Sequence, residues 1–197
     1  MNGFEKRAAL IKDKILKTTL EMLKTLEPSN LRIADIAKTA QVSQVTIYNY
    51  FGGKEALIHE VVKNYIDSSI SDFQKYMQQD GTVKEKIEKM ILQDKEAYHT
   101  LSPFLINQLL TEDKELAEYV QKETNEKIIP SMIKLIEDGK ENGEISEKVT
   151  TQAFLVFINF CLKHYQELVE MVNQENNTDL IESMHHIFFY GICGKEE

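Results

Sequence analysis

The stretch "IADIAKTAQVSQVTIYNYFGGKEAL" (residues 33–57) decides the fold of the N-terminal part of this chain. Two short segments with apolar residues at helical spacing flank the polar turn "QVS". Ser43 is a typical N-cap and predicts a helix that runs to Phe51. Gly52 and Gly53 end this helix, because only glycine enters the left-handed conformation freely. Two short helices joined by a tight turn have the shape of a helix-turn-helix unit.

An amphipathic helix precedes this unit. Apolar residues recur at helical spacing from Ala8 to Leu26, with lysines between them, and the stretch "EPSN" ends the pattern. Asn30 is expected to cap the second helix, which runs to Ala40. The N-terminal segment therefore predicts three helices, of which the second and third form the helix-turn-helix unit.

The third helix is expected to have a covered side and an exposed side. Ile47, Tyr50 and Phe51 share the side that the first two helices can cover. The residues expected to face outward are Gln44, Val45, Thr46, Tyr48 and Asn49.

The chemistry of the exposed side indicates DNA reading. Amides pair with the edge of adenine, and apolar groups contact the thymine methyl. Hydroxyls and phenols donate to phosphate. Lys54 begins the next helix, where free N–H groups and the helix dipole favour an anion. The alternative is a solvated polar helix face on which Tyr48 and Tyr50 are packing residues.

Charge is divided unevenly along the chain, whose net charge is −9. Residues 1–54 hold nine Lys/Arg and five Asp/Glu, whereas residues 55–197 hold fourteen and twenty-seven. A basic N-terminal segment on an acidic body is the asymmetry expected for nucleic-acid contact.

The rest of the chain also predicts helices, so the fold class is all-α with about nine helices. Only 8 of the 197 residues are Gly and 3 are Pro, and 42% are apolar, which favours long helices around a core. Thr82 and Glu85 form a capping box. Ser102 and Pro103 open another helix, and Pro130 is expected to kink or split a long one. The expected ranges are 54–78, 82–99, 102–110, 114–142, 149–173 and 179–193.

The last two segments, 149–173 and 179–193, contain the apolar runs "FLVFINFCL" and "IFFYGIC". A helix that is apolar nearly all round must be buried on most sides. We expect both helices to pack against a second copy of the chain in a homodimer. The alternative is that they fill the chain's own core.

Residues 33–57 closely resemble the N-terminal signature of the TetR/AcrR family of transcriptional regulators. The matching residues are Ile36, Ala37, Ala40, Val42, Ser43, Thr46, Ile47, Tyr48, Tyr50, Phe51, Lys54, Glu55, Ala56 and Leu57. The resemblance implies a three-helix DNA-binding head (1–53) and a six-helix ligand-binding and dimerisation body (54–197). It also implies a homodimeric repressor that binds a near-palindromic operator in double-stranded DNA and is released by a small molecule; repression rather than activation is a family expectation only.

The resemblance assigns roles by position. Base contacts are implied for Gln44, Val45, Thr46 and Asn49. Phosphate contacts are implied for Thr46, Tyr48, Tyr50 and Lys54.

The chain departs from the family at two places. The family usually has glycine where Gln41 stands, so Gln41 must take a conformation that costs a non-glycine residue up to about 1–2 kcal/mol. The family often has threonine just ahead of the second helix, where this chain has Leu31 and Arg32. Arg32 is expected to contact phosphate instead.

The sequence does not identify the effector, and no cofactor is expected. Six residues of the body are candidates for a ligand pocket, although apolar residues at helical spacing belong to a core more often than to a pocket. They are Phe104, Tyr119, Phe154, Phe157, Tyr165 and Met184.

An enzyme with a di-metal carboxylate site is the main rival hypothesis. Glu96-x-x-His99 and Glu182-x-x-His185 are the helical elements of such a site. The site also needs a further Glu on each of two other helices, and Pro103 interrupts a simple four-helix order. We therefore expect that the protein binds no metal ion and is not an enzyme. A helical protein-binding module without DNA binding is the third alternative.

A cytoplasmic protein with no membrane partner is expected. Charged residues run through "MNGFEKRAALIKDKILKTTL", where a signal peptide would be apolar. The longest apolar run, 154–158, is too short to span a bilayer. Cys161 and Cys193 have no metal-type spacing and are expected to be reduced thiols.

Overall fold

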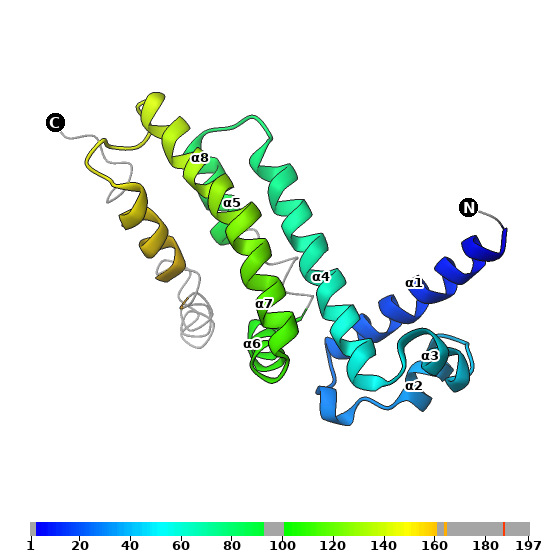
Figure 1. Ribbon diagram of the computed structural model, residues 1–197. Helices are drawn as coiled ribbons and strands as arrows, with labels where there is room; N and C mark the ends of the chain where they lie inside the picture. Colours follow the sequence, from blue (N-terminus) through cyan, green and yellow to red (C-terminus); the bar gives the residue numbers. More distant parts are fainter. Residues whose placement is uncertain (1–2, 93–100, 161–163, 165–186, 188–197) are drawn as a thin grey trace, which may run out of the picture. The chain divides into compact units, whose positions relative to one another are not determined.

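The computed structural model describes residues 3–92, 101–160, 164 and 187, and all regular structure within these residues is helical (Figure 1). The chain forms two compact units. Unit 1 comprises residues 1–71 and 95–123, and unit 2 comprises residues 72–94 and 124–197. The all-α fold class is therefore confirmed. The boundary expected between residues 53 and 54 stays a prediction.

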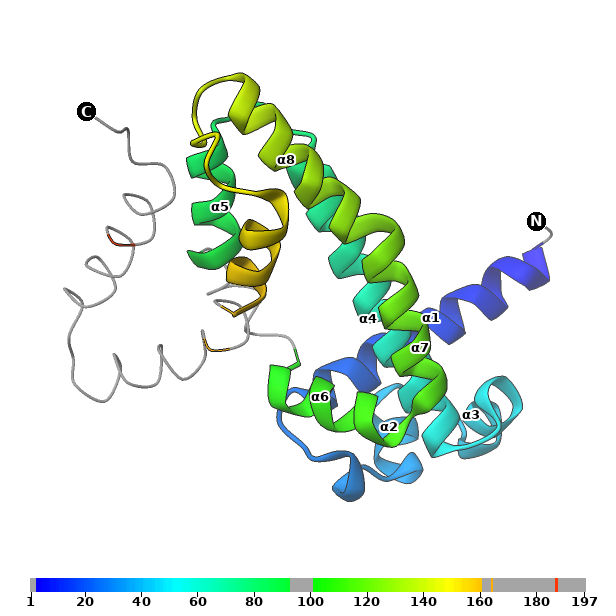
Figure 2. The ribbon, with the colours of Figure 1, turned by 60° about the vertical axis from the view of Figure 1, so that its left-hand side comes forward.

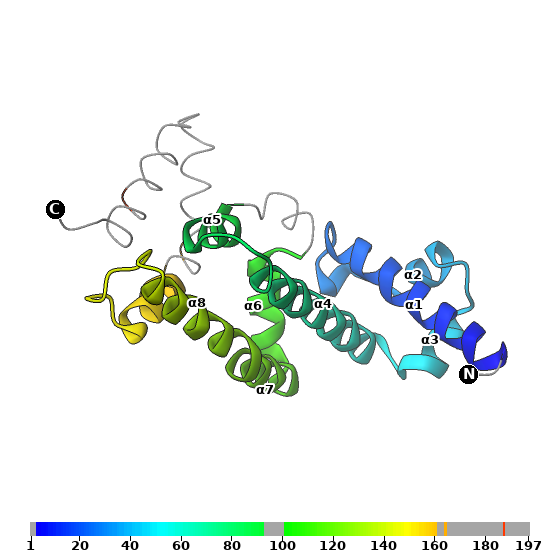
Figure 3. The same ribbon diagram turned by 90° about the horizontal axis from the view of Figure 1, so that it is seen from above.

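Unit 1 contains the N-terminal helices and two later ones that pack with the start of α4. Its elements are α1 (Gly3–Leu23), the 3-10 turn η1 (Pro28–Asn30), α2 (Ile33–Thr39), α3 (Gln44–Phe51), the first part of α4 (Lys54–Met77), α6 (Pro103–Glu112) and α7 (Lys114–Glu123). Helices α1, α2 and α3 lie together beside the first turns of α4 (Figure 3). Each of these four helices has a fully buried residue, namely Ile15, Ile36, Ile47 and Leu57. The helix-turn-helix unit therefore buries apolar side chains together with α1 and α4 of unit 1.

Unit 2 contains the end of α4, α5 (Val83–Leu92), the π-helical turn η4 (Thr124–Ile128), α8 (Ile129–Glu141) and a helical stretch over residues 151–160. Helix α5 lies against α8 (Figure 2). Ile87, Ile136 and Phe154 lie in one apolar cluster between these helices. Gly139 permits the close approach, because a Cβ there would lie 2.7 Å from the Cγ2 of Val83.

The helix caps predicted at Ser43, Ser102 and the Thr82–Glu85 box are confirmed. The hydroxyls of Ser43 and Ser102 each accept the backbone N–H three residues further on, at 3.0 and 3.2 Å. In the capping box, the amide of Thr82 donates to Glu85 Oε2 at 2.8 Å, and the amide of Glu85 donates to the Thr82 hydroxyl at 3.1 Å. These bonds satisfy N–H groups that a helix start leaves without intrahelical partners.

The cap predicted at Asn30 is wrong. Asn30 ends η1, and Arg32 stands at the N-cap of α2 without a side-chain bond to that helix. Leu31 separates the two elements in an extended conformation, with its side chain only 1% exposed. The N-cap of α2 therefore lies at Arg32, two residues beyond Asn30.

The long helix expected over residues 114–142 is split, as Pro130 predicted. α7 and α8 are joined through η4, and Pro130 lies in the first turn of α8. Proline lacks an N–H and its ring collides with the carbonyl four residues earlier, so the preceding turn widens. The first helix also ends at Leu23 rather than Leu26, and α6 continues to Glu112.

Several predictions fall on residues that the structure does not describe. They include the end of the fifth predicted helix (93–99), residues 161–163 and 165–173 of the helix expected over 149–173, and the helix expected over 179–193 except residue 187. The expected thiols of Cys161 and Cys193 lie there as well. In the described part of the chain, no helix is long and apolar enough to cross a membrane.

Candidate nucleic-acid interface

Helix α3 buries one side and exposes the other. Ile47 is 0% exposed, whereas Val45 is 66% and Tyr48 is 51% exposed. Gln44 and Asn49 are also exposed, and Thr46 is half-buried. The outward position predicted for Gln44, Val45, Tyr48 and Asn49 is therefore confirmed, whereas Thr46 is partly covered.

Tyr50 is an exception to the predicted division. It was expected on the covered side with Ile47 and Phe51, but its side chain is 37% exposed. Tyr50 lies at the edge of that side, where its ring contacts Phe51 with 6.3 Å between centroids. Its phenol is thus accessible to a partner, whereas Phe51 is half-buried.

The first turn of α3 holds one of the predicted contact residues in a defined orientation. Ser43 Oγ accepts the amide of Thr46 at 3.0 Å and also lies 2.8 Å from the Thr46 hydroxyl. One hydroxyl of this pair donates to the other. The Thr46 hydroxyl is therefore positioned by the helix cap before any partner binds.

The turn before α3 contains a non-glycine residue in a left-handed conformation. Gln41 has φ of 53°. Its amide donates to the carbonyl of Lys38 at 3.2 Å, and the amide of Val42 donates to the carbonyl of Ala37 at 2.9 Å. This bonding pattern is a Schellman motif with Gln41 at the position that glycine usually occupies. The predicted left-handed conformation is therefore confirmed, and it costs a non-glycine residue up to about 1–2 kcal/mol.

The Gln41 side chain has a partner on α1. Its carbonyl oxygen Oε1 accepts a hydrogen bond from Lys14 Nζ at 3.3 Å, and both residues are exposed. Sequence reasoning predicted the strained backbone but not this contact. The sequence signal for a functional side chain here is a glutamine at a left-handed position, because glycine would adopt the same backbone without strain.

The cationic residues predicted to contact phosphate lie at helix starts. Lys54 is the first residue of α4, and its Nζ donates to the carbonyl of Pro28 at 3.0 Å. An ammonium has three N–H donors, so two remain for other acceptors. Arg32 is exposed at the N-cap of α2. The phosphate contacts themselves stay predictions.

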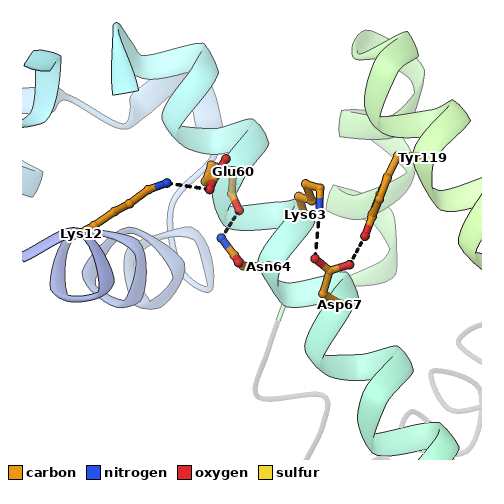
Figure 4. A network of polar contacts seen from close by, with 6 residues as sticks. All are labelled: Lys12, Glu60, Lys63, Asn64, Asp67 and Tyr119. Carbon is orange, nitrogen blue, oxygen red and sulfur yellow. Dashed lines mark hydrogen bonds and ion pairs between the residues drawn. The ribbon is translucent and has the colours of Figure 1, made fainter. Parts of the chain in front are cut away.

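Polar residues on α4 connect this helix to α1 (Figure 4). Glu60 Oε1 accepts from Lys12 Nζ of α1 at 3.0 Å. Asn64 Nδ2 donates to the backbone carbonyl of Glu60 at 2.8 Å. Helix α4 therefore has an ion pair to the N-terminal helix as well as its apolar contacts.

One turn further along, α4 is bonded to α7 (Figure 4). Lys63 Nζ donates to Asp67 at 3.0 Å and lies 4.0 Å from the centre of the Tyr119 ring. The Tyr119 hydroxyl donates to the other oxygen of Asp67. The hydrogen bond to Asp67 raises the pKa of Tyr119 above its usual value, and the same carboxylate raises the pKa of Lys63.

A second polar contact joins α4 to the start of α7. His59 Nδ1 lies 2.5 Å from Asp113 Oδ2, and Asp113 Oδ1 accepts the amide of Leu116 at 2.9 Å. Burial raises the pKa of Asp113, but hydrogen bonds from the Leu116 amide and from His59 outweigh it and hold the pKa below its usual value. Asp113 thus caps α7 and contacts α4 at once.

A half-open cleft of about 640 Å³ lies in unit 1, between residues 28–29, the first turns of α4 and the junction of α6 with α7. Its lining carries charges of both signs, including Lys54, Lys114 and Asp113, with Ile58 and Leu109 as apolar walls. Tyr119 is not among the described residues that line it.

The six predicted pocket residues are not gathered at one described site. Tyr119 belongs to unit 1, whereas Phe154 and Phe157 belong to unit 2. Phe154 is only 1% exposed in the unit 2 core, and Phe157 is 41% exposed. The side chain of Phe104 and all of Tyr165 and Met184 lie outside the described part. The pocket therefore stays a prediction.

Among the residues that the structure describes, no group of three His, Cys, Asp or Glu could hold a metal ion. The two Glu-x-x-His pairs, 96–99 and 182–185, lie outside these residues.

Comparison with known proteins gives one family match and many similar folds. Residues 15–61 match the family of bacterial regulatory proteins named tetR. The reduced form of NemR from Escherichia coli matches with a TM-score of 0.71 at 16% identity, over 94% of this chain and 100% of that chain. A TetR-family regulator from Agrobacterium tumefaciens matches with a TM-score of 0.69 at 14% identity, over 94% of this chain and 99% of that chain. FadR from Bacillus subtilis, in complex with stearoyl-CoA, matches with a TM-score of 0.55 at 20% identity, over 93% of this chain and 98% of that chain.

Because these sequence identities are low, the structural matches establish the fold alone. The sequence match covers the helices that form the candidate interface. No curated protein matches the sequence.

Proposed function

We propose that this chain, a TetR/AcrR-family regulator by its N-terminal domain and its fold, represses transcription as a ligand-released homodimer. The observation that carries the proposal is the divided surface of α3. Ile47 is fully buried, while Gln44, Val45, Tyr48 and Asn49 are exposed. A helix anchored on one side and bearing amides and an apolar group on the other suits the major groove.

The operator is expected to be a near-palindrome. Two recognition helices of a dimer enter successive major grooves about 34–36 Å apart. The helical stretch 151–160 supports dimerisation, because Val156 and Phe160 are 65% and 60% exposed while Phe154 is buried. Exposed apolar groups on a helix of this kind are typical of an interface.

Release by a ligand requires a coupling free energy between the ligand site and the DNA-binding helices. Helix α4 is the element that supports such coupling. Glu60 joins it to α1, and His59 and Asp67 join it to α7. A ligand that displaces α7 therefore acts on α4, which borders α3 in the chain.

The proposal is tested by selecting bound duplexes from a random pool, followed by a screen for small molecules that release them. Acyl-CoA compounds are a first group to screen, since FadR from Bacillus subtilis was solved with stearoyl-CoA. Tyr48→Phe and Lys54→Ala should weaken binding to all duplexes alike, because phosphate contacts carry no sequence information. Gln44→Ala should relax the preference at one base pair.

Two outcomes would contradict the proposal. Duplex binding without a steep salt dependence would favour a protein-binding module. Each phosphate contact contributes about −0.9 to the slope of the logarithm of the binding constant against the logarithm of the salt concentration. Equal affinity of a ligand for the free and the DNA-bound protein would exclude release by that ligand.

A further inference from the structure

Lys14 and Gln41 form an exposed pair beside the start of the recognition helix. Lys14 lies on α1, and Gln41 lies in the turn three residues before Gln44, the first residue of α3. The hydrogen bond from Lys14 Nζ to Gln41 Oε1 spans 27 positions of sequence. The pair therefore combines side chains from two elements at one place on the surface.

The backbone at Gln41 does not favour glutamine. With φ of 53° at the C′ position of a Schellman motif, this is a site where glycine is free of strain. Strained residues persist where the surrounding structure holds them, and they concentrate at functional sites. A side chain kept at such a position points to a use for that side chain.

The hydrogen bond fixes which atoms the pair presents. A lysine ammonium only donates, so the Gln41 oxygen must face it and the two N–H groups of Nε2 face away. Lys14 retains two further N–H donors after its bond to Gln41. The pair thus offers several N–H donors and one positive charge, which is the chemistry that a phosphate oxygen accepts.

We propose that Lys14 and Gln41 together form a phosphodiester-binding clamp that contacts the DNA backbone next to the N-terminus of α3. The clamp deepens the proposed function and rests on it. Lys14 supplies the charge, and Gln41 orients Lys14 and adds a neutral donor. The contact is independent of base sequence and fixes where α3 enters the groove.

The test uses the full-length protein and a mixed-sequence duplex, for which no operator needs to be known. Affinity is measured over a range of salt concentrations, and thermal unfolding is measured on the same samples. Lys14→Ala should weaken binding about 5- to 20-fold at low salt and reduce the salt slope by about 0.9 for each contacting subunit. Lys75→Ala is the matched control, because Lys75 is 70% exposed, pairs with Asp72 and belongs to unit 2.

Gln41→Gly separates the role of the side chain from that of the backbone. It should raise the unfolding temperature by removing the strain, yet weaken duplex binding about 2- to 10-fold by removing a hydrogen bond. Gln41→Glu keeps the reach to Lys14 but presents a negative charge to phosphate. It should bind more weakly than Gln41→Gly and show no gain in stability.

Each result decides the inference. It is overturned if Gln41→Gly binds the duplex as tightly as the wild type, or if Lys14→Ala keeps the wild-type salt slope. If the wild-type protein itself shows no salt-dependent duplex binding, the proposed function fails and the clamp fails with it. If the wild type and Lys75→Ala bind normally while the clamp variants also bind normally, only the clamp is refuted.

Discussion

The orientation of α3 can be tested by truncating two residues that are two positions apart. Ile47 is 0% exposed and Val45 is 66% exposed. Ile47→Ala removes three buried carbons, worth about 2.4 kcal/mol at 0.8 kcal/mol each, and leaves a cavity that adds to the loss. Alanine has the higher helix propensity and returns up to about 0.7 kcal/mol. We expect Ile47→Ala to lower the free energy of unfolding by about 2–4 kcal/mol.

Val45→Ala should behave differently because its side chain is mostly in water. The expected change in the free energy of unfolding lies within about 0.5 kcal/mol. Chemical denaturation followed by far-UV circular dichroism measures both variants. Val45→Ala should instead alter base preference in the selected duplexes, since a methyl-bearing residue contacts the thymine methyl. Equal destabilisation by the two substitutions would refute the orientation of α3 and with it the candidate interface.

Three further predictions concern packing and polar contacts. Gly139→Ala should lower the free energy of unfolding by about 1–3 kcal/mol, because its Cβ would lie 2.7 Å from Val83 Cγ2; unchanged stability in denaturation experiments would contradict this packing. Tyr119→Phe removes the hydroxyl bonded to Asp67 but keeps the ring beside Lys63, so the loss should be about 1 kcal/mol or less by thermal unfolding; a loss as large as that of a core truncation would contradict it. The pKa of Asp113 is lower in the folded protein than its usual value, so this carboxylate stabilises the fold above about pH 3.9 and the stabilisation is lost as pH falls through the folded pKa. Asp113→Asn should flatten that part of the curve of unfolding free energy against pH, and a curve identical to that of the wild type would contradict it.

Local sequence patterns predicted most of the helix boundaries. Ser43, Ser102 and the Thr82–Glu85 box act within one helical turn, so their effect is visible in the sequence itself. Asn30 has the same capping chemistry but ends η1, and the buried Leu31 after it is extended. Burial of Leu31 depends on distant helices, so the local pattern around Asn30 could not predict where α2 begins.

Local sequence patterns also predicted part of the candidate nucleic-acid interface. The exposed face of α3 follows from helical spacing and the position of Ile47. The strain at Gln41 could be predicted because the resemblance places glycine there. Its bond to Lys14 could not, since the residues lie 27 positions apart and no local pattern links them.

The sequence by itself determined that the chain is helical, where the helix-turn-helix unit lies and, Tyr50 apart, which side of its third helix is covered. These features depend on interactions within a few residues, which spacing and capping chemistry specify. Only the tertiary structure decided the partners of α4, because Lys12–Glu60, His59–Asp113 and Tyr119–Asp67 are separated by 48, 54 and 52 positions. Such pairs form only after apolar packing has brought distant helices together, and many Lys, Asp and Glu residues could have formed them equally well on charge alone.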